Sequence, residues 1–159
     1  MSYLILKLIH IASVTLFIGN ITTGVFWGMR AHRSRDFRLI ASTFDGIIQS
    51  DRWFTMPGVI GIVVSGIAAA LLGKLPILGT GWILWGIILF VIAGIVFGRG
   101  VAPLQRDIAS LARTADTDAA TWTAYEKLYR GWAMWGLVAL LAPVGALIIM
   151  VLKPPLPAF

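Results

Sequence analysis

The side chain with the clearest capacity for chemistry is His10, which lies in a long apolar stretch near the N-terminus. An ionisable side chain inside a membrane span is costly and usually faces a bundle interior or a cavity. His10, Ser13, Phe17, Asn20 and Gly24 recur every three or four positions, so polar and small groups share one helical face. This spacing predicts that the face carrying His10 packs inside a bundle.

Three roles are open to His10. A neutral imidazole in a dry, aromatic-lined bundle can be an axial ligand to haem b, and this interpretation makes His10 the metal ligand. The imidazole can instead form a hydrogen bond between helices, with Ser65 at similar depth in the second span as its expected partner, or it can relay a proton or a substrate. If haem is bound, the candidate pocket residues are Ser13, Asn20, Ser65 and Met150.

The remaining potential ligands are few. His32 lies among arginines in the first long loop, on the opposite side of the predicted membrane from His10, so a bis-histidine haem within one chain is excluded. The sixth position would need water, Met150 or a residue of a second copy. Because the chain contains no cysteine, disulfides, thiolate metal sites, iron-sulfur clusters and covalent haem attachment are excluded as well.

A second candidate site begins at Ser50 and Asp51, where the second span opens. Either residue could cap exposed helical amides, as such residues commonly do at helix starts. Alternatively, Asp51 could pair with Arg99 or Arg130 from neighbouring helix ends and close the bundle or form a cytoplasmic anion site. Together with Arg52, these residues make up the predicted cytoplasmic charge cluster.

The elements that must position these side chains are membrane helices. Hydrophobic residues make up 58% of the 159 positions and charged residues 13%, and the mean hydropathy is +0.88. The apolar residues fall in four blocks, each long enough to cross ~30 Å of hydrocarbon. We therefore predict an all-α, single-domain, integral membrane four-helix bundle over residues 1–159, with spans at about 3–29, 52–73, 81–101 and 131–152.

The distribution of cations predicts how the bundle is oriented. Ten arginines and lysines fall in the two long loops and their flanks, against three on the other side. Excess positive charge marks the cytoplasmic side, so both termini are expected to face the exterior or periplasm. The net charge of +6 is thus explained by topology, and no nucleic-acid partner is expected. The ten residues are Arg30, Arg33, Arg35, Arg38, Arg52, Arg99, Arg106, Arg113, Lys127 and Arg130; the three are Lys7, Lys74 and Lys153.

Helices are also expected outside the spans. Residues 36–49 combine apolar and polar side chains in a pattern typical of an interfacial helix, and residues 103–129 indicate two helices joined by a polar turn at 114–118. Small residues four positions apart, at Gly24 and Gly28 and at Gly94 and Gly98, could bring two helices close together within one chain or in a homodimer.

Two motifs carry a family resemblance. Lys7-Leu8-Ile9-His10 followed by Gly19-Asn20, and Asp51-Arg52-Trp53-Phe54-Thr55-Met56-Pro57, resemble a bacterial family of predicted integral membrane proteins defined only as a domain of unknown function. The resemblance covers nearly all of the chain and implies a four-helix fold in a bacterial inner membrane, without an activity.

The lysine and histidine at the start of the first span are also distantly similar to J-type protoporphyrinogen oxidases and to the membrane domain of copper-resistance D proteins. In the oxidases a first-helix histidine is implicated in haem b binding, and the resemblance assigns that role to His10. Those oxidases also use an intramembrane lysine, which the third span here lacks.

Two functional interpretations follow. The first is a membrane bundle that binds haem b or a porphyrin through His10, carries out redox chemistry near the outer leaflet and has a membrane redox partner. The second is a non-enzymatic membrane subunit or small transporter, in which His10 and Asn20 pack or relay and the arginine-rich loops dock a partner or anionic lipid. In both interpretations the lipid bilayer is the main partner.

Overall fold

The computed structural model describes residues 1–115 and 119–158, and in these ranges it contains helices and no strand. In chain order the elements are α1 (Ser2–Ser34), α2 (Phe37–Ser50), η1 (Asp51–Thr55), α3 (Met56–Leu72), α4 (Gly81–Val96), η2 (Phe97–Val101), α5 (Ala102–Thr114) and α6 (Ala119–Leu152). They form four long continuous helices, which we call the first to fourth rods: α1, α2–η1–α3, α4–η2–α5 and α6. The second and third rods each contain a π-helical turn. The all-α four-helix fold predicted from the sequence is confirmed.

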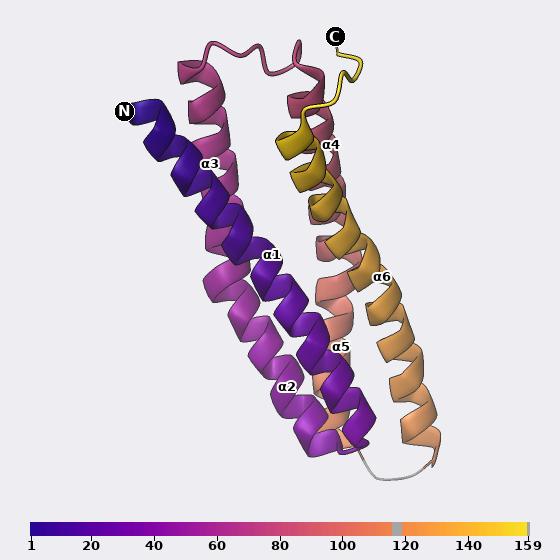
Figure 1. The fold of residues 1–159 in the computed structure, drawn as a ribbon. Helices are drawn as coiled ribbons and strands as arrows, with labels where there is room; N and C mark the ends of the chain where they lie inside the picture. The colour runs from indigo at the N-terminus through magenta and orange to yellow at the C-terminus, as the bar shows by residue number, and fades with distance from the viewer. Residues whose placement is uncertain (116–118, 159) are drawn as a thin grey trace.

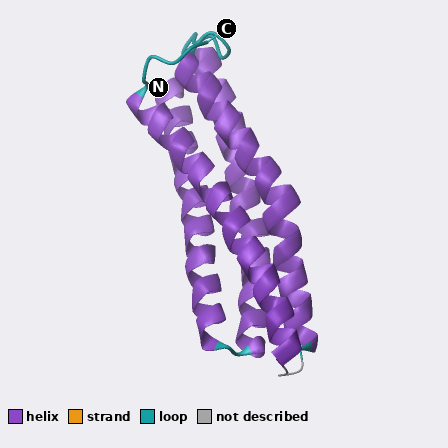
Figure 2. Ribbon diagram, turned by 90° about the vertical axis from the view of Figure 1, so that its right-hand side faces the viewer, coloured by secondary structure: helices purple, strands orange, loops and turns teal. Residues whose placement is uncertain are grey.

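The rods are antiparallel neighbours (Figures 1 and 2). Both termini and the connection between α3 and α4 lie at one end, which we call the terminal end. The turn between α1 and α2, the last residues of α5 and the first residues of α6 lie at the other, which we call the arginine-rich end. The four predicted spans fall within the four rods, to within one residue at Gly73.

Each rod is longer than a bilayer requires. The rods contain 33 to 36 residues and each has an 18-residue window apolar enough to cross a membrane. At 1.5 Å per residue they extend over about 50 Å, whereas the hydrocarbon core is about 30 Å thick. Part of the bundle therefore projects from the membrane, and α2, α5 and the start of α6 are the polar segments that do so.

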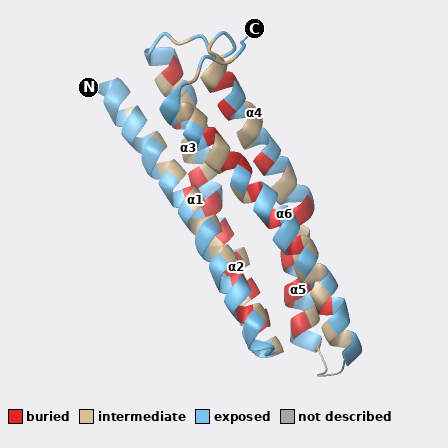
Figure 3. Cartoon of the chain, turned by 45° about the vertical axis from the view of Figure 1, so that its right-hand side comes forward, coloured by how far each residue is buried: buried red, intermediate tan, exposed pale blue. Residues whose placement is uncertain are grey.

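The projecting half resembles a small soluble bundle. The amphipathic helix expected at residues 36–49 is present as α2, but it continues through η1 into α3 without a break, and its apolar face packs against α5. Ile40, Phe44 and Ile108 are fully buried there, next to Tyr125 of α6. Figure 3 shows such buried positions along the inner faces of the rods, whereas the first turns of α1 are exposed.

The terminal half is organised as two helix pairs. In this half α1 packs along α3 and α4 packs along α6, and the Cα traces of α3 and α4 do not come within 8 Å of each other. Glycines make the first pair possible. A methyl group on Gly58 would lie 3.2 Å from Cβ of Phe17, and one on Gly66 would lie 3.0 Å from the His10 ring. This close contact of small residues is how membrane helices associate where no water drives them together.

Candidate functional site

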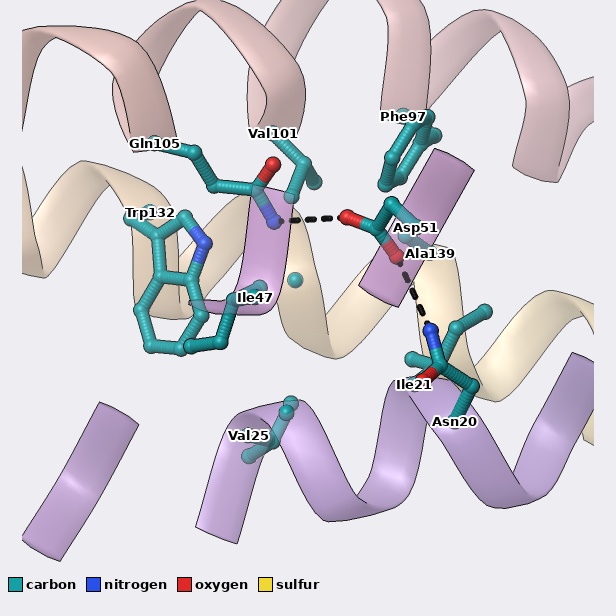
Figure 4. A pocket seen from close by; sticks show the side chains of 12 residues that line it. Asn20, Ile21, Val25, Ile47, Asp51, Phe97, Val101, Gln105, Trp132 and Ala139 are labelled. Carbon is teal, nitrogen blue, oxygen red and sulfur yellow. Dashed lines mark hydrogen bonds between the residues drawn. The ribbon is translucent and has the colours of Figure 1, made fainter. Parts of the chain in front are cut away.

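A buried polar network centred on Asp51 joins three of the four rods where the two halves of the bundle meet (Figure 4). Asp51 begins η1 and its side chain is directed inward, with only 8% of the residue exposed. Asn20 Nδ2 of α1 donates to Asp51 Oδ1 at 3.1 Å, and Gln105 Nε2 of α5 donates to Asp51 Oδ2 at 3.2 Å. The carboxylate thus connects the first, second and third rods.

Thr55 completes the network from one helical turn further along. Its hydroxyl donates to Asp51 Oδ1 at 2.8 Å and accepts from Asn20 Nδ2 at 2.9 Å. Thr55 is 2% exposed and Asp51 is 8% exposed, so neither side chain can turn to solvent. Buried polar groups are tolerated only when they are paired, and every partner of the carboxylate here is a neutral donor.

A small cavity lies beside this network and is lined by Asn20, Asp51, Gln105 and apolar side chains. Its volume is about 30 Å³, enough for one water molecule. The indole of Trp132 forms part of the wall, and its Nε1–H is buried without a hydrogen-bond partner among the described residues. A polar molecule bound in this cavity would accept a hydrogen bond from the Trp132 Nε1–H and so pair the buried donor.

Both π-helical turns adjoin the cavity. Asp51 begins η1, and Phe97 and Val101, the first and last residues of η2, line the cavity from the third rod. A π-turn contains one extra residue, so the helix faces before and after it are rotated relative to one another. At these turns the second and third rods change their packing partners: α2 packs against α5, whereas α3 packs along α1 and α4 packs along α6. Such π-bulges are frequent at functional sites.

His10 lies toward the terminal end of the α1–α3 pair. Its Nδ1 is 3.0 Å from the carbonyl oxygen of Ile62 and 3.3 Å from Oγ of Ser65, whose hydroxyl donates to the carbonyl of Gly61. Because a carbonyl only accepts, this geometry assigns the proton to Nδ1 and leaves the lone pair on Nε2. The interhelical contact expected between His10 and Ser65 is present.

Two of the other predicted pocket residues lie away from His10: Asn20 belongs to the Asp51 network, and Met150 packs against Gly86 in the α4–α6 pair. Ser13, one helical turn along α1 from His10, packs against Gly61 of α3. Among the described residues, no group of three or more His, Asp or Glu side chains is arranged to hold a metal ion.

The family described as "Predicted integral membrane protein (DUF2269)" matches residues 4–154. The chain belongs to this family. No curated protein and no solved structure matches it. Membership of this DUF2269 family confirms the resemblance seen in the two motifs and the integral membrane character of the four helices.

In this DUF2269 bundle the predicted charge cluster does not form around Asp51. Arg52 and Arg99 point outward and are exposed, and Arg130 pairs with Glu126 on its own helix at 3.2 Å. The expected cap is also absent, because α2 continues through Ser50 and Asp51 and no amide is left free there. Asp51 therefore neither pairs with an arginine nor caps a helix, and its hydrogen-bond partners are neutral side chains.

Sequence reasoning missed three residues of the site: Thr55, Gln105 and Trp132. A signal existed for Gln105, which is in phase with the buried residues Ile108, Ala109 and Ala112 and is therefore a polar residue on an apolar face. Thr55 follows Asp51 by four positions and so shares its face. Trp132 gives no such signal, because a tryptophan near the end of a span is equally typical of the aromatic belt at a membrane interface.

Proposed function

We propose that this chain is a small membrane transporter that takes up and releases a proton or a small monovalent cation at Asp51. One observation carries the proposal: a carboxylate is buried between three rods of an apolar bundle and contacts only neutral donors. An ionisable residue so placed in a membrane protein is most often part of an ion or proton pathway. A proton needs no ligand other than the carboxylate, whereas a cation would require Asn20 and Gln105 to turn their amide oxygens toward it.

The α1–α3 pair supplies a second titratable group on the same route. Ser65, the neighbour of His10, follows Asp51 by 14 positions, or about 21 Å along the helix. Between the two sites Phe17 packs against Gly58 and is 6% exposed, so the interface is apolar and closed there. Transfer between the sites would require α1 to shift along α3. The smooth glycine surface of α3 supports that motion.

The membrane and orientation remain those expected from the sequence. We place the chain in a bacterial inner membrane with the arginine-rich end in the cytoplasm. The support is the excess of cations at that end, which is the end where Arg33, Arg38 and Arg113 lie. Asp51 would then lie near the cytoplasmic boundary of the hydrocarbon and His10 in the outer leaflet.

Flux through proteoliposomes tests the function. The purified chain is reconstituted with either a pH-sensitive or a sodium-sensitive dye inside the vesicles, and a gradient of the matching ion is imposed. We expect uptake by the wild type, a fall to the level of empty vesicles for Asp51→Asn, and unchanged uptake for Asp107→Asn, which removes an exposed carboxylate of α5. Wild-type vesicles that pass neither ion, or an Asp51→Asn variant as active as the wild type, would overturn the proposal.

A second candidate is the haem b site predicted from the sequence. One observation favours it: the Nδ1–H of His10 bonds to the Ile62 carbonyl, which is the usual way of orienting a ligating imidazole and exposing the other nitrogen. The remainder of the predicted pocket does not fit, because Met150 lies in the other helix pair and the His10 ring packs against Gly66.

Absorption spectroscopy distinguishes this candidate. Oxidised and dithionite-reduced spectra and a pyridine haemochrome assay are recorded for the wild type and His10→Ala after expression with ample haem. A Soret band that disappears in the variant would establish the haem site. A colourless wild type would exclude it and leave His10 as a packing or relay residue.

A further inference from the structure

A second site lies on the outside of the bundle, in a groove between α2 and α5. Its volume is about 590 Å³, which is within the range of small-molecule sites. Three arginines line it: Arg52 from η1, and Arg106 and Arg113 from α5. With Asp45 as the single acidic residue in the lining, the groove has a formal charge of +2.

The arginines of this groove differ in how they are held. Arg113 forms a two-pronged ion pair with Asp45, which ties α5 to α2 and fixes one wall. Arg52 and Arg106 are exposed, and neither has a hydrogen bond or an ion pair to any described residue. Two guanidinium groups from separate rods thus border the same groove without an ion-pair partner among the described residues.

The internal network sets the two free arginines at the same level. Asp51 and Gln105 are hydrogen-bonded to each other inside the bundle, and Arg52 and Arg106 are the next residue along each rod. Arg52 is also the last charged residue before an uncharged stretch that extends to Gly73. The groove therefore opens where the apolar part of the second rod begins, which is the level of lipid headgroups.

The surface beside the groove is apolar and faces lipid. Trp53, in the groove wall, is 70% exposed, as is usual for tryptophans that anchor a protein at the membrane interface. Phe54, Met56 and Ile60 continue this exposed surface along the second rod. A free anion would use only the arginines, whereas a lipid would use the arginines and this apolar surface together.

We propose that this groove binds an anionic glycerophospholipid, with its phosphodiester between Arg52 and Arg106 and its acyl chains along the exposed face of α3. Guanidinium groups bind phosphate oxygens through paired, charge-assisted hydrogen bonds, and basic pockets between membrane helices are known sites for anionic headgroups. The bound lipid would bridge the second and third rods on the side opposite Asp51. This assignment is independent of ion transport.

Native mass spectrometry and thermal unfolding of the full chain in detergent micelles test the site. The probes are dioleoylphosphatidylglycerol, dioleoylphosphatidylcholine and inorganic phosphate. The variant is Arg52→Gln/Arg106→Gln. The control is Arg38→Gln/Arg99→Gln, which removes two exposed arginines outside the groove. Circular dichroism checks that all proteins are helical.

We expect wild type and control to retain phosphatidylglycerol and to unfold at higher temperature in its presence, but not with phosphatidylcholine. The groove variant should bind phosphatidylglycerol at least about tenfold more weakly, since each lost charge-assisted bond is worth about that factor. Equal retention by variant and wild type would overturn the proposal. Stabilisation by inorganic phosphate alone, lost in the groove variant, would also overturn it by identifying a site for free anions.

Discussion

Replacing Asp51 provides the sharpest test of the buried network, because two substitutions there have opposite structural consequences. Leucine removes the acceptor of Asn20, Thr55 and Gln105 at once. The Thr55 hydroxyl can turn to a main-chain carbonyl and still accept from Asn20, but the buried amide of Gln105 loses its partner. An unpaired buried donor costs about 1–3 kcal/mol, so we expect Asp51→Leu to lower the free energy of unfolding by about 1–3 kcal/mol.

Asparagine at position 51 preserves most of the network. Its side-chain oxygen can accept from Asn20 and Thr55, and Gln105 can rotate its amide so that its oxygen accepts from the new Nδ2. The expected loss is below about 1 kcal/mol, the net value of one hydrogen bond. The two variants therefore separate the charge, which the proposed transport requires, from the hydrogen bonds, which stabilise the bundle.

Reversible unfolding in mixed micelles, followed by circular dichroism during titration with dodecyl sulfate, measures both variants. Asp107→Leu, at an exposed site on α5, is the control for the change from carboxylate to leucine and should lie within about 0.5 kcal/mol of the wild type. If Asp51→Leu were as stable as this control, the carboxylate would not be holding three rods together.

Two further predictions concern packing and topology. Gly28→Ala should destabilise the bundle by about 1–3 kcal/mol, because the new methyl group would lie 2.5 Å from the ring of Trp132; Gly94→Ala, with nothing within 4 Å, should cost nothing in the same unfolding titration, and an equal loss in both would contradict the contact. Since the chain has no cysteine, single cysteines at Ser2 and Ser42 report topology. A membrane-impermeant maleimide should label the first in intact spheroplasts and the second only after lysis, and the reverse pattern would invert the proposed orientation.

The four rods could be predicted from the sequence because each contains an apolar block of bilayer length, and hydropathy alone reports that property. The continuity of α2 with α3 could not be predicted in this way. Asp51 looked like a helix start because a charged pair interrupts the apolar pattern at residues 51 and 52. The interruption instead marks a change of neighbours within one rod, which depends on tertiary packing.

The candidate site was half predictable for the same reason. Asn20 and His10 were found because polar residues in an apolar span stand out, and the contact between His10 and Ser65 followed from their equal depth. Gln105 lies in a helix that contains many polar residues, so its inward orientation is visible only once the phase of α5 is known. The homodimer suggested by Gly94 and Gly98 remains a prediction; both glycines face open space.

The position of the Asp51 network follows from a difference in what holds each half of the bundle together. At the arginine-rich end, amphipathic helices bury Ile40, Phe44 and Ile108 away from water, and this burial favours a closed four-rod core. At the terminal end lipid is as apolar as the side chains, so only close contacts at small residues such as Gly58 remain, and the rods separate into pairs. A polar network placed where the closed core ends can stay buried on one side while the pairs beyond it move. If Asp51 carries a proton or cation as proposed, substitutions in the network should reduce uptake into proteoliposomes more than core substitutions with an equal loss of unfolding free energy.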